Sequence, residues 1–310
     1  MVKMGTKPKH FLSISDLTPN EVQELLDSAV ELKTRGWITP LKNKTMAILF
    51  EKPSLRTRVS FEVAMRQLGG QTIYLSPEEV GLGKRESIPD VARVLSRFID
   101  VIVLRTFAQQ NLEVLAEYSS VPVINALSDF EHPCQALADL LTIYEHKGKL
   151  KRLTLAYVGD GNNVANSLML ACAMTGVNFN IASPEGYTID KSILKKAQTY
   201  AKTSGAKILC TEDPRLAARD VDVIYTDTWT SMGQEAEAKV RRKVFSTYQV
   251  NEKLMALTKK NSIIMHCLPA HHGEEVAVGL LDSDRSVVFN QAENRMHAQK
   301  ALLAWIFAKK

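Results

Sequence analysis

The sequence has 310 residues, 45% of them hydrophobic and 24% charged, a composition typical of a folded globular protein with two domains of about 150 residues each. Its formal net charge of +5 comes from interspersed basic residues, without the basic stripe or stacking aromatics of a nucleic-acid-binding protein, so anionic metabolites are better partners. The four cysteines are widely spaced and no run of about 18 apolar residues occurs, so we expect a cytoplasmic protein without disulfides, a zinc ribbon, export or membrane insertion.

The first half of the chain alternates between helical and strand patterns. A capping box begins at Thr18, with Pro19 at the first helical position, and apolar residues then recur at helical spacing as far as Gly36. Short apolar runs between further helical patterns predict strands at 45–50, 71–75, 101–104 and 121–124. Strands separated by helices are typical of a parallel sheet.

The same alternation resumes after the polar segment EHKGKLKR, and we place a domain boundary near Gly148. The second half has predicted strands at 153–158, 179–182, 223–225 and 263–265. The sequence therefore predicts an α/β protein of two domains, 1–147 and 148–310, each a doubly wound unit with a parallel sheet. The last helix, at about 292–310, is apolar enough to dock on the first domain.

The segment FEKPSLRTR places hydroxyls and arginines where a strand becomes a helix. Residues 54–57 lie at the helix N-terminus, where free N–H groups and the helix dipole can hold a phosphate together with hydroxyls and a guanidinium. Residues two apart on a helix point about 200° apart, so we expect Arg56 to bind the anion and Arg58 to be structural. The alternative is a capped helix with surface arginines.

Two more polar groups follow predicted strands of the first half. Arg105 comes directly after the apolar run VIVL, at the carboxyl end of a strand, where open α/β sheets bind ligands. The motif HPCQ has His132 and Gln135 three apart on one side of a helix start, with Pro133 suited to its first turn. A histidine and an amide can polarise a carbonyl oxygen, although a histidine in this place can also simply cap a helix.

The motif YVGDGNNVANSL matches only the start of a dinucleotide fingerprint. Val164 and Ser183 stand where that fingerprint has a glycine and an acid. A nicotinamide dehydrogenase is therefore disfavoured, and absence of NAD binding would exclude it.

The motif HCLPAHHGEE contains four side chains able to bind a metal, His266, Cys267, His271 and His272. Their spacing fits no familiar zinc pattern and Pro269 interrupts it, so we predict no metal site. Cys267 beside a histidine also suggests a thiol nucleophile, but neighbours in an extended strand point to opposite faces.

Seven motifs together resemble the ornithine carbamoyltransferases in their order and spacing: SLRTR, Arg105, HPCQ, DGNN, DTWTSMG, HCLP and ENRMHAQKA. The resemblance covers nearly the whole chain. The related aspartate carbamoyltransferases are similar over the phosphate half but lack the Ser-Met-Gly loop, residues 231–233 here, so this loop decides the acceptor. The resemblance implies that 1–147 binds carbamoyl phosphate, that 148–310 binds ornithine, and that a cleft between them closes on both substrates.

The resemblance also implies the residues of the site. Those expected to bind carbamoyl phosphate are Ser54, Leu55, Arg56, Thr57, Arg105, His132, Pro133, Cys134, Gln135, Cys267, Leu268 and Arg295. Those expected to bind ornithine are Asn163, Asp227, Ser231 and Met232. The catalytic candidates among them are Arg105, His132, Gln135 and Cys267.

The implied reaction is attack by a neutral amine on carbamoyl phosphate, which gives citrulline and phosphate in arginine metabolism and needs no cofactor. The resemblance further implies a homotrimer, or a higher assembly of trimers, with sites near the subunit boundaries. Other interpretations within reach are a carbamoyltransferase for another amine, such as putrescine, and a paralogue that only binds anions. Asp227 and the Ser-Met-Gly loop argue against the first, and the intact set of site residues argues against the second.

Two positions depart from the family pattern. Leu55 stands where the family commonly has threonine; one hydroxyl is lost but the backbone N–H remains, so we expect only a modest loss of phosphate contacts. Gly81 stands where a glutamine commonly reaches the substrate from a neighbouring subunit, and this leaves the contribution across the interface open.

Overall fold

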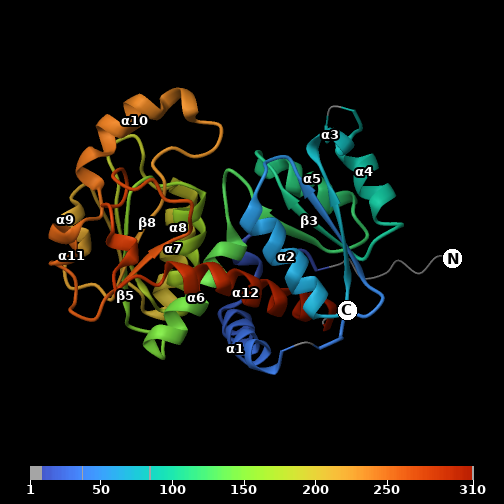
Figure 1. The fold of residues 1–310 in the computed structure, drawn as a ribbon, viewed down its shortest axis with the longest axis horizontal. Helices are drawn as coiled ribbons and strands as arrows, with labels where there is room; N and C mark the ends of the chain where they lie inside the picture. Colours follow the sequence, from blue (N-terminus) through green and yellow to red (C-terminus); the bar gives the residue numbers. More distant parts are fainter. Residues whose placement is uncertain (1–8, 37, 84, 309–310) are drawn as a thin grey trace. The chain divides into compact units, whose positions relative to one another are not determined.

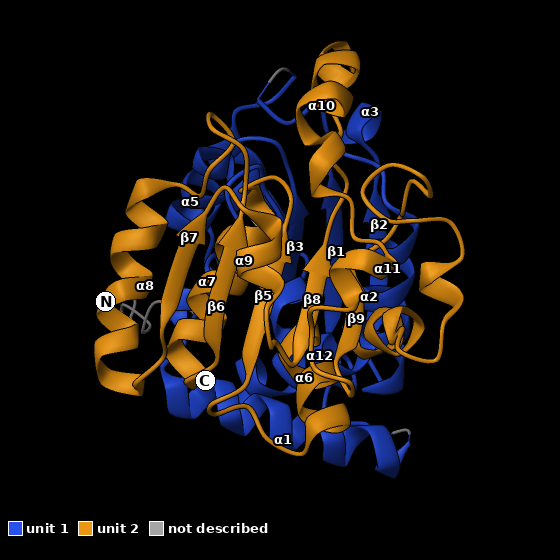
Figure 2. Ribbon diagram, turned by 90° about the vertical axis from the view of Figure 1, so that its left-hand side faces the viewer, with its two compact units in different colours: residues 1–137, 295–310 blue, residues 138–294 orange. Residues whose placement is uncertain are grey.

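The computed structural model describes residues 9–36, 38–83 and 85–308, so the ends of both predicted domains, 1–8 and 309–310, lie outside the described residues. The chain forms two compact units, one of Met1–Leu137 with Arg295–Lys310 and one of Ala138–Asn294, coloured separately in Figure 2. The expected domains 1–147 and 148–310 stay a prediction about binding roles. Packing divides the chain at other points, within two helices, and returns the last residues to the first unit.

Unit 1 contains a sheet of four parallel strands in the order β2-β1-β3-β4. The strands are β1 (Thr45–Phe50), β2 (Gln71–Leu75), β3 (Val101–Arg105) and β4 (Val123–Leu127). The helical segments that begin in this unit are η1 (Ile14–Asp16), α1 (Pro19–Arg35), α2 (Leu55–Gln67), α3 (Pro77–Val80), α4 (Ile88–Leu95), α5 (Gln109–Tyr118) and α6 (Pro133–Lys147).

Alternate apolar side chains of β1 are buried on opposite faces of the sheet of unit 1. Ala47 and Leu49 of β1 pack in one cluster with buried residues of α4 and α5, while Met46, Ile48 and Phe50 point to the other face and are just as buried. β1 is therefore apolar on both sides, as expected for a parallel strand between helices.

The last helix, α12 (Val288–Ala308), enters unit 1 at Arg295, and Figure 1 shows its C-terminal half beside α1 and α2. Lys300 of this helix is buried, and its Nζ donates to the Leu32 carbonyl at 2.7 Å and to Gln67 Oε1 at 3.0 Å. Burial lowers the pKa of Lys300. One ammonium thus joins three helices, in line with the expected docking of the last helix on the first domain.

Unit 2 contains a sheet of five parallel strands in the order β7-β6-β5-β8-β9, which lie side by side in Figure 2. The strands are β5 (Thr154–Val158), β6 (Asn178–Ala182), β7 (Ile208–Thr211), β8 (Val223–Thr226) and β9 (Ile263–His266). The helical segments that begin in this unit are α7 (Asn163–Thr175), α8 (Lys191–Ser204), α9 (Pro214–Ala218), η2 (Glu235–Glu237), α10 (Ala238–Val244), η3 (Phe245–Tyr248), α11 (Glu252–Met255), η4 (Leu280–Asp282) and α12.

A buried hydrogen-bond network connects two strands of unit 2 with two of its helices. Gln291 donates to Asp139 Oδ1 at 2.7 Å and to the Tyr225 hydroxyl at 3.1 Å, and its own Oε1 accepts the His266 N–H at 2.9 Å. Tyr225 also donates to Asp139 Oδ2 at 3.2 Å. Residues of α6, β8, β9 and α12 are thus fixed together with their polar atoms paired, as burial requires.

The structure confirms most predicted elements and changes a few. The strands at 45–50 and 71–75 and the capping box at Thr18 are confirmed to the residue. β4 begins at Val123 rather than at 121, because Pro122 has no N–H for the ladder and only its carbonyl is used, by Ile102 N. β7 was not predicted, since this edge strand is only partly buried and lacks an apolar run. The last helix begins at Val288, earlier than 292.

Within the described part of the chain, no helix combines the length and the apolar character needed to cross a membrane.

The Lys300→Ala variant is expected to lower the free energy of unfolding of unit 1 by about 1–3 kcal/mol, because the Leu32 carbonyl and Gln67 lose a buried donor. Urea denaturation followed by circular dichroism measures the effect. Lys196→Ala, which removes an exposed lysine of α8, is the control. Equal stability of the two variants would contradict a role for Lys300 in joining the helices.

Candidate active site

The polar groups of unit 1 gather at the carboxyl edge of its sheet. The chain passes from β1 to β2 on one side and returns to β3 and β4 on the other, so the order of the strands reverses between β1 and β3. Open α/β sheets bind ligands at such a point. The loops after β1 and β4 carry Ser54 and His132 to this edge, and Arg105 is the last residue of β3.

Helix α2 begins at the expected anion site. Ser54 is its N-cap, with an extended backbone, and Ser54 Oγ accepts the Thr57 N–H at 3.3 Å. The two hydroxyls lie 3.0 Å apart, and Thr57 Oγ1 also accepts a hydrogen bond from Arg295 Nη2. Arg295 is 3% exposed, so the last helix brings a buried guanidinium to the N-terminus of α2.

The two arginines of this motif have different surroundings. Arg58 is exposed; its Nε donates to Glu62 at 2.9 Å and its guanidinium carbon lies 3.8 Å from the centre of the Tyr74 ring. Arg56 is half-buried, and among the described residues its guanidinium has no hydrogen-bond or ion-pair partner. Leu55, the first residue of α2, is 77% exposed.

A turn after β4 positions His132 at the start of α6. Ser128 Oγ accepts the N–H groups of Phe130 and Glu131 at 3.2 and 3.0 Å. The His132 carbonyl then accepts the first helical N–H groups, with Gln135 N at 3.0 Å. Pro133 occupies the first helical position, where its missing N–H is not needed.

His132 is a neutral imidazole in this site. Burial, and the positive charges of Arg295 and Arg105 nearby, hold the pKa of His132 well below its ordinary value. Arg105 and Gln135 are themselves buried. The arrangement joins two guanidinium groups, a neutral imidazole and an amide, which together can bind an anion and polarise a carbonyl.

Cys134 does not offer a reactive thiol here. Its Sγ donates to the Asn125 carbonyl at 3.3 Å, and burial raises the pKa of the thiol to about 12. Its backbone N–H, in the first turn of α6, is the group suited to an anion.

Lys52 was missed by the motif reasoning. It is 3% exposed, pairs with Asp129, and its Nζ lies 4.1 Å from the centre of the Phe107 ring. The residue therefore ties the loop before Ser54 to the loop before His132. A lysine two residues after a buried strand and just before the hydroxyl cluster was the available signal.

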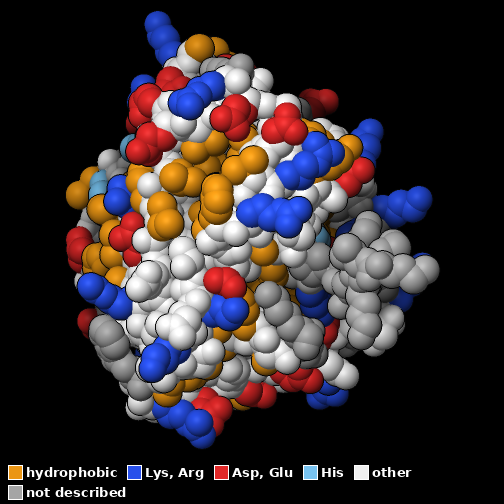
Figure 3. Space-filling model, turned by 90° about the vertical axis from the view of Figure 1, so that its right-hand side faces the viewer, with side chains coloured by type: hydrophobic (Ala, Val, Ile, Leu, Met, Phe, Trp, Pro, Cys, Tyr) orange, Lys and Arg blue, Asp and Glu red, His pale blue; other side chains and the backbone are white. Residues whose placement is uncertain are grey.

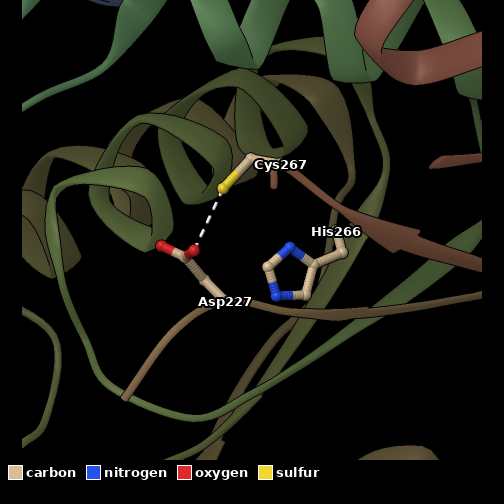
Figure 4. Close-up of side chains that lie close together, drawn as sticks. All are labelled: Asp227, His266 and Cys267. Atoms are coloured by element: carbon tan, nitrogen blue, oxygen red, sulfur yellow. Dashed lines mark hydrogen bonds between the residues drawn. The ribbon is translucent and has the colours of Figure 1, made fainter. Parts of the chain in front are cut away.

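Unit 2 has its own group of polar residues at the carboxyl ends of β5, β8 and β9. These strands are neighbours, and the strand order reverses between β5 and β8. Asp227 follows β8 and is 7% exposed. Its Oδ1 accepts the Thr228 N–H at 2.8 Å and the Cys267 thiol at 3.0 Å, a contact drawn in Figure 4.

Asn162 holds Asp227 from the other side and was not predicted. Its Nδ2 donates to Asp227 Oδ2 at 2.8 Å, while its Oδ1 accepts the Val164 and Ala165 N–H groups at 3.0 and 3.1 Å. It is the N-cap of α7, and the expected ligand Asn163 is the first helical residue. An asparagine directly before an apolar helical pattern was the sequence signal for this cap.

The expected acceptor loop runs from Asp227 to α10. Ser231 is half-buried and Met232 is 45% exposed. The backbone of this loop is held locally: Ser231 N donates to Gln234 Oε1 at 3.1 Å, and Gly233 N donates to the Glu235 carboxylate at 3.0 Å.

A buried histidine shapes the loop of Cys267 and Leu268. His266 Nδ1 accepts the Leu268 N–H at 2.8 Å, so the ring proton is on Nε2, which lies 3.2 Å from Glu275 Oε1. Burial alone raises the pKa of Glu275, but hydrogen bonds from His266 and from the His271 backbone outweigh it and the pKa is lowered. Leu268 has a φ of 55°, a left-handed conformation that the His266 contact helps to hold.

Two groups of side chains in the described residues have metal-ligand chemistry. In the first, Asp227, His266 and Cys267 come close together (Figure 4). Both ring nitrogens of His266 and the thiol proton already have partners, so these contacts account for the group without a cation. In the second group, Glu274 Oε1 accepts from Arg242 at 2.8 Å and Glu275 Oε1 accepts from His266 and from the His271 backbone.

Gly81 closes α3 with a left-handed conformation, φ 56°. A Cβ at this position would lie 2.7 Å from the Cβ of Arg85. A glutamine would therefore be strained in this backbone, and the turn gives a local reason for a glycine at position 81.

Comparisons with known proteins give the following matches. The family model described as "Aspartate/ornithine carbamoyltransferase, carbamoyl-P binding domain" matches residues 9–145, and the one described as "Aspartate/ornithine carbamoyltransferase, Asp/Orn binding domain" matches 151–306. Ornithine carbamoyltransferase of Anoxybacillus flavithermus is 54% identical, with 96% of each chain covered, and that of Archaeoglobus fulgidus is 51% identical, with 97% and 98% covered. The solved structure of the Pyrococcus furiosus enzyme of that name has a TM-score of 0.93 at 50% identity, with 96% of each chain covered.

Acid is expected to destabilise the protein through His132. Because its folded pKa lies below the unfolded value of about 6.5, only the unfolded chain takes up this proton, so stability falls as the pH drops through that value. Urea denaturation between pH 7.5 and 5 should give a His132→Gln variant a shallower pH slope, by up to about 1.4 kcal/mol per pH unit. His272→Gln, at an exposed position, is the control. The same slope in His132→Gln and the unaltered protein would reject a neutral, buried His132.

Proposed function

Because the chain belongs to the aspartate/ornithine carbamoyltransferase family, we propose that it transfers the carbamoyl group of carbamoyl phosphate to the side-chain amine of L-ornithine, giving L-citrulline and phosphate. The observation that carries this proposal is the contrast between the two groups of polar residues. Unit 1 collects guanidinium groups, a neutral imidazole and a helix N-terminus, while unit 2 presents a buried carboxylate beside a thiol. The first set suits a phosphate and the second an ammonium.

Carbamoyl phosphate is assigned to the residues of unit 1. The phosphate would be held by Arg56, by Ser54 and Thr57, and by the N–H groups at the start of α2, whose dipole favours an anion. Leu55 would contribute its N–H alone. Arg105, Arg295, Gln135 and His132 would grip the phosphate and the carbamoyl group. A neutral His132 can donate to the carbonyl oxygen without repelling the guanidinium groups around it.

The reaction begins with attack of the neutral δ-amine on the carbamoyl carbon. The carbon becomes tetrahedral, its oxygen becomes an oxyanion, and the donors around that oxygen stabilise the charge. Collapse expels inorganic phosphate, and the amine proton leaves to a phosphate oxygen or by way of Cys267. Since phosphate is already a good leaving group, orientation and charge stabilisation supply most of the acceleration.

Ornithine is assigned to the residues of unit 2. Asp227 would accept hydrogen bonds from the α-ammonium, in an orientation fixed by Asn162 and Thr228. Asn163, Ser231 and Met232 would meet the rest of the amino-acid end. Cys267 and Leu268 would lie beside the reacting amine, and the hydrogen bond from Cys267 to Asp227 places the thiol next to the group assigned to ornithine.

We also propose a cytoplasmic homotrimer or higher assembly of trimers. All four cysteines are free thiols, which suits a reducing compartment. Exposed hydrophobic side chains of unit 1, among them Ile73, Val94 and Phe98, suit an interface between copies of the chain. Figure 3 shows hydrophobic side chains gathered on one face of the molecule.

The acceptor is expected to be L-ornithine, with a preference over putrescine and L-aspartate of several orders of magnitude. Putrescine presents the same reacting amine but offers the buried Asp227 carboxylate no ammonium partner. Asp227→Ala should lose most of this preference. The control is Asp282→Ala, which removes a carboxylate distant in sequence from Asp227 and should keep the preference. Citrulline and N-carbamoylputrescine formation are measured side by side. Equal use of putrescine by the unaltered enzyme would contradict ornithine as the acceptor but would not contradict carbamoyl transfer.

The two arginines of SLRTR are expected to differ in their effect on carbamoyl phosphate. Arg56→Ala should weaken its binding by about 1.5–3 kcal/mol, the worth of hydrogen bonds to a charged group. Arg58→Ala should leave affinity unchanged, because this side chain is turned to Glu62 and Tyr74. Isothermal titration calorimetry of both variants decides the matter, and an equal loss in both would show that the roles are wrongly divided.

A further inference from the structure

Arg241, in α10, contacts both loops of unit 2 to which ornithine is assigned. It is 6% exposed, and its Nη1 donates to Asp160 Oδ2 at 2.7 Å and to the Trp229 carbonyl at 2.9 Å. Asp160 lies in the loop that carries Asn162, and Trp229 lies between Asp227 and Ser231. A single guanidinium nitrogen therefore joins the two loops.

The position of this guanidinium is itself fixed from other directions. Its Nε donates to Glu237 at 3.1 Å, and its central carbon lies 4.9 Å from the centre of the Tyr187 ring. Trp229 is held as well, since its ring stacks on Phe245 with centroids 5.9 Å apart. A planar group with several fixed donors is suited to such a place, and a flexible ammonium is not.

The acceptor loop needs an anchor of this kind. It has no strand or helix between Thr226 and Glu235. The backbone N–H groups of Ser231 and Gly233 donate only to side chains two or three positions away in the chain. Segments held only by local, exposed hydrogen bonds open easily. The Trp229 carbonyl binds the middle of this loop to the buried side chain of Arg241 in α10, in addition to the contacts that Asn162 and Cys267 make with Asp227 at its start.

We propose that Arg241 is a positioning residue for acceptor recognition, which sets the loop of Asp227, Ser231 and Met232 against the loop of Asn162 and Asn163. This inference rests on the function proposed above. Arg241 acts through the Trp229 carbonyl and the Asp160 carboxylate. Its contribution concerns ornithine and not carbamoyl phosphate, whose assigned phosphate contacts belong to unit 1.

A merely structural role makes different predictions. A variant that only destabilises unit 2 lowers the fraction of active enzyme, so kcat falls for every acceptor while KM and the ratio between acceptors stay the same. A misplaced acceptor loop instead raises the KM for ornithine and lowers the preference for ornithine over putrescine. The affinity for carbamoyl phosphate stays the same in both cases.

The experiment compares Arg241→Met and Arg241→Lys with Arg242→Met and Arg242→Lys. Arg242 is the adjacent residue of the same helix, but its side chain is 58% exposed and pairs with Glu274. Arg241→Met should raise the KM for ornithine roughly tenfold or more and lower the ornithine preference by a similar factor, as loss of charged hydrogen bonds predicts. Arg241→Lys should be intermediate, because it keeps the charge but not the fork of donors. The Arg242 variants should match the unaltered enzyme.

A double variant, Arg241→Met with Asp160→Asn, separates positioning from folding. Arg241→Met alone leaves a buried carboxylate without its cation, which can prevent folding. The second change removes that charge, so the double variant should recover thermal stability and still show the raised KM. Recovery of KM together with stability would overturn the inference.

A folded Arg241→Met enzyme with unchanged KM and unchanged acceptor preference would also overturn it. If the unaltered enzyme forms no citrulline from ornithine and carbamoyl phosphate, the proposed function fails and takes this inference with it. Citrulline formation with unaltered kinetics in Arg241→Met rejects the inference alone.

Discussion

Parallel pairing of neighbouring strands is the constraint on which both groups of polar residues depend. In unit 1 the ladders from β1 to β3 and from β3 to β4 bring Arg105 and His132, which are 51 and 78 residues after Ser54 in the chain, to the same edge of the sheet. In unit 2 the ladders from β5 to β8 and from β8 to β9 do the same for Asn162, Asp227 and Cys267. The backbone hydrogen bonds of the sheet therefore determine which side chains can meet, and the side chains determine what they can bind.

Charge is managed differently in the two units. Unit 1 places the guanidinium groups of Arg105 and Arg295 near His132, and burial together with these two positive charges lowers the pKa of His132. Such an arrangement is costly without a ligand and becomes favourable with an anion between the cations. In unit 2, Asn162, Thr228 and Cys267 each donate a hydrogen bond to the carboxylate of Asp227. That carboxylate is thereby oriented in advance of any ammonium that it meets.

Sequence reasoning predicted the parts of the fold that depend on local pattern. The apolar run at 45–50 and the capping box at Thr18 depend on residues adjacent in the chain, and both are confirmed. The edge strand β7 was missed because its four residues show no strand pattern of their own. Its stability comes from pairing with β6, which the local sequence does not indicate. The roles of site residues came from motifs, which identify the residues in contact with a ligand better than the residues that hold them. Lys52, Asn162 and Arg241 belong to the second kind: each binds an aspartate distant in the chain, and only the structure reveals these pairings.

Asn162 shows how narrowly one position can be constrained. Helix caps elsewhere in unit 2, such as Asp190 and Asp213, use only an acceptor oxygen, and serine or threonine can replace them at modest cost. At Asn162 the cap of α7 uses the amide oxygen while the amide nitrogen serves Asp227. Aspartate would cap equally well but would face a second carboxylate, serine cannot reach both partners, and glutamine is one carbon too long for the cap. The substitutions that an ordinary helix cap tolerates are therefore excluded here, and we expect relatives with the same activity to have only asparagine at this position.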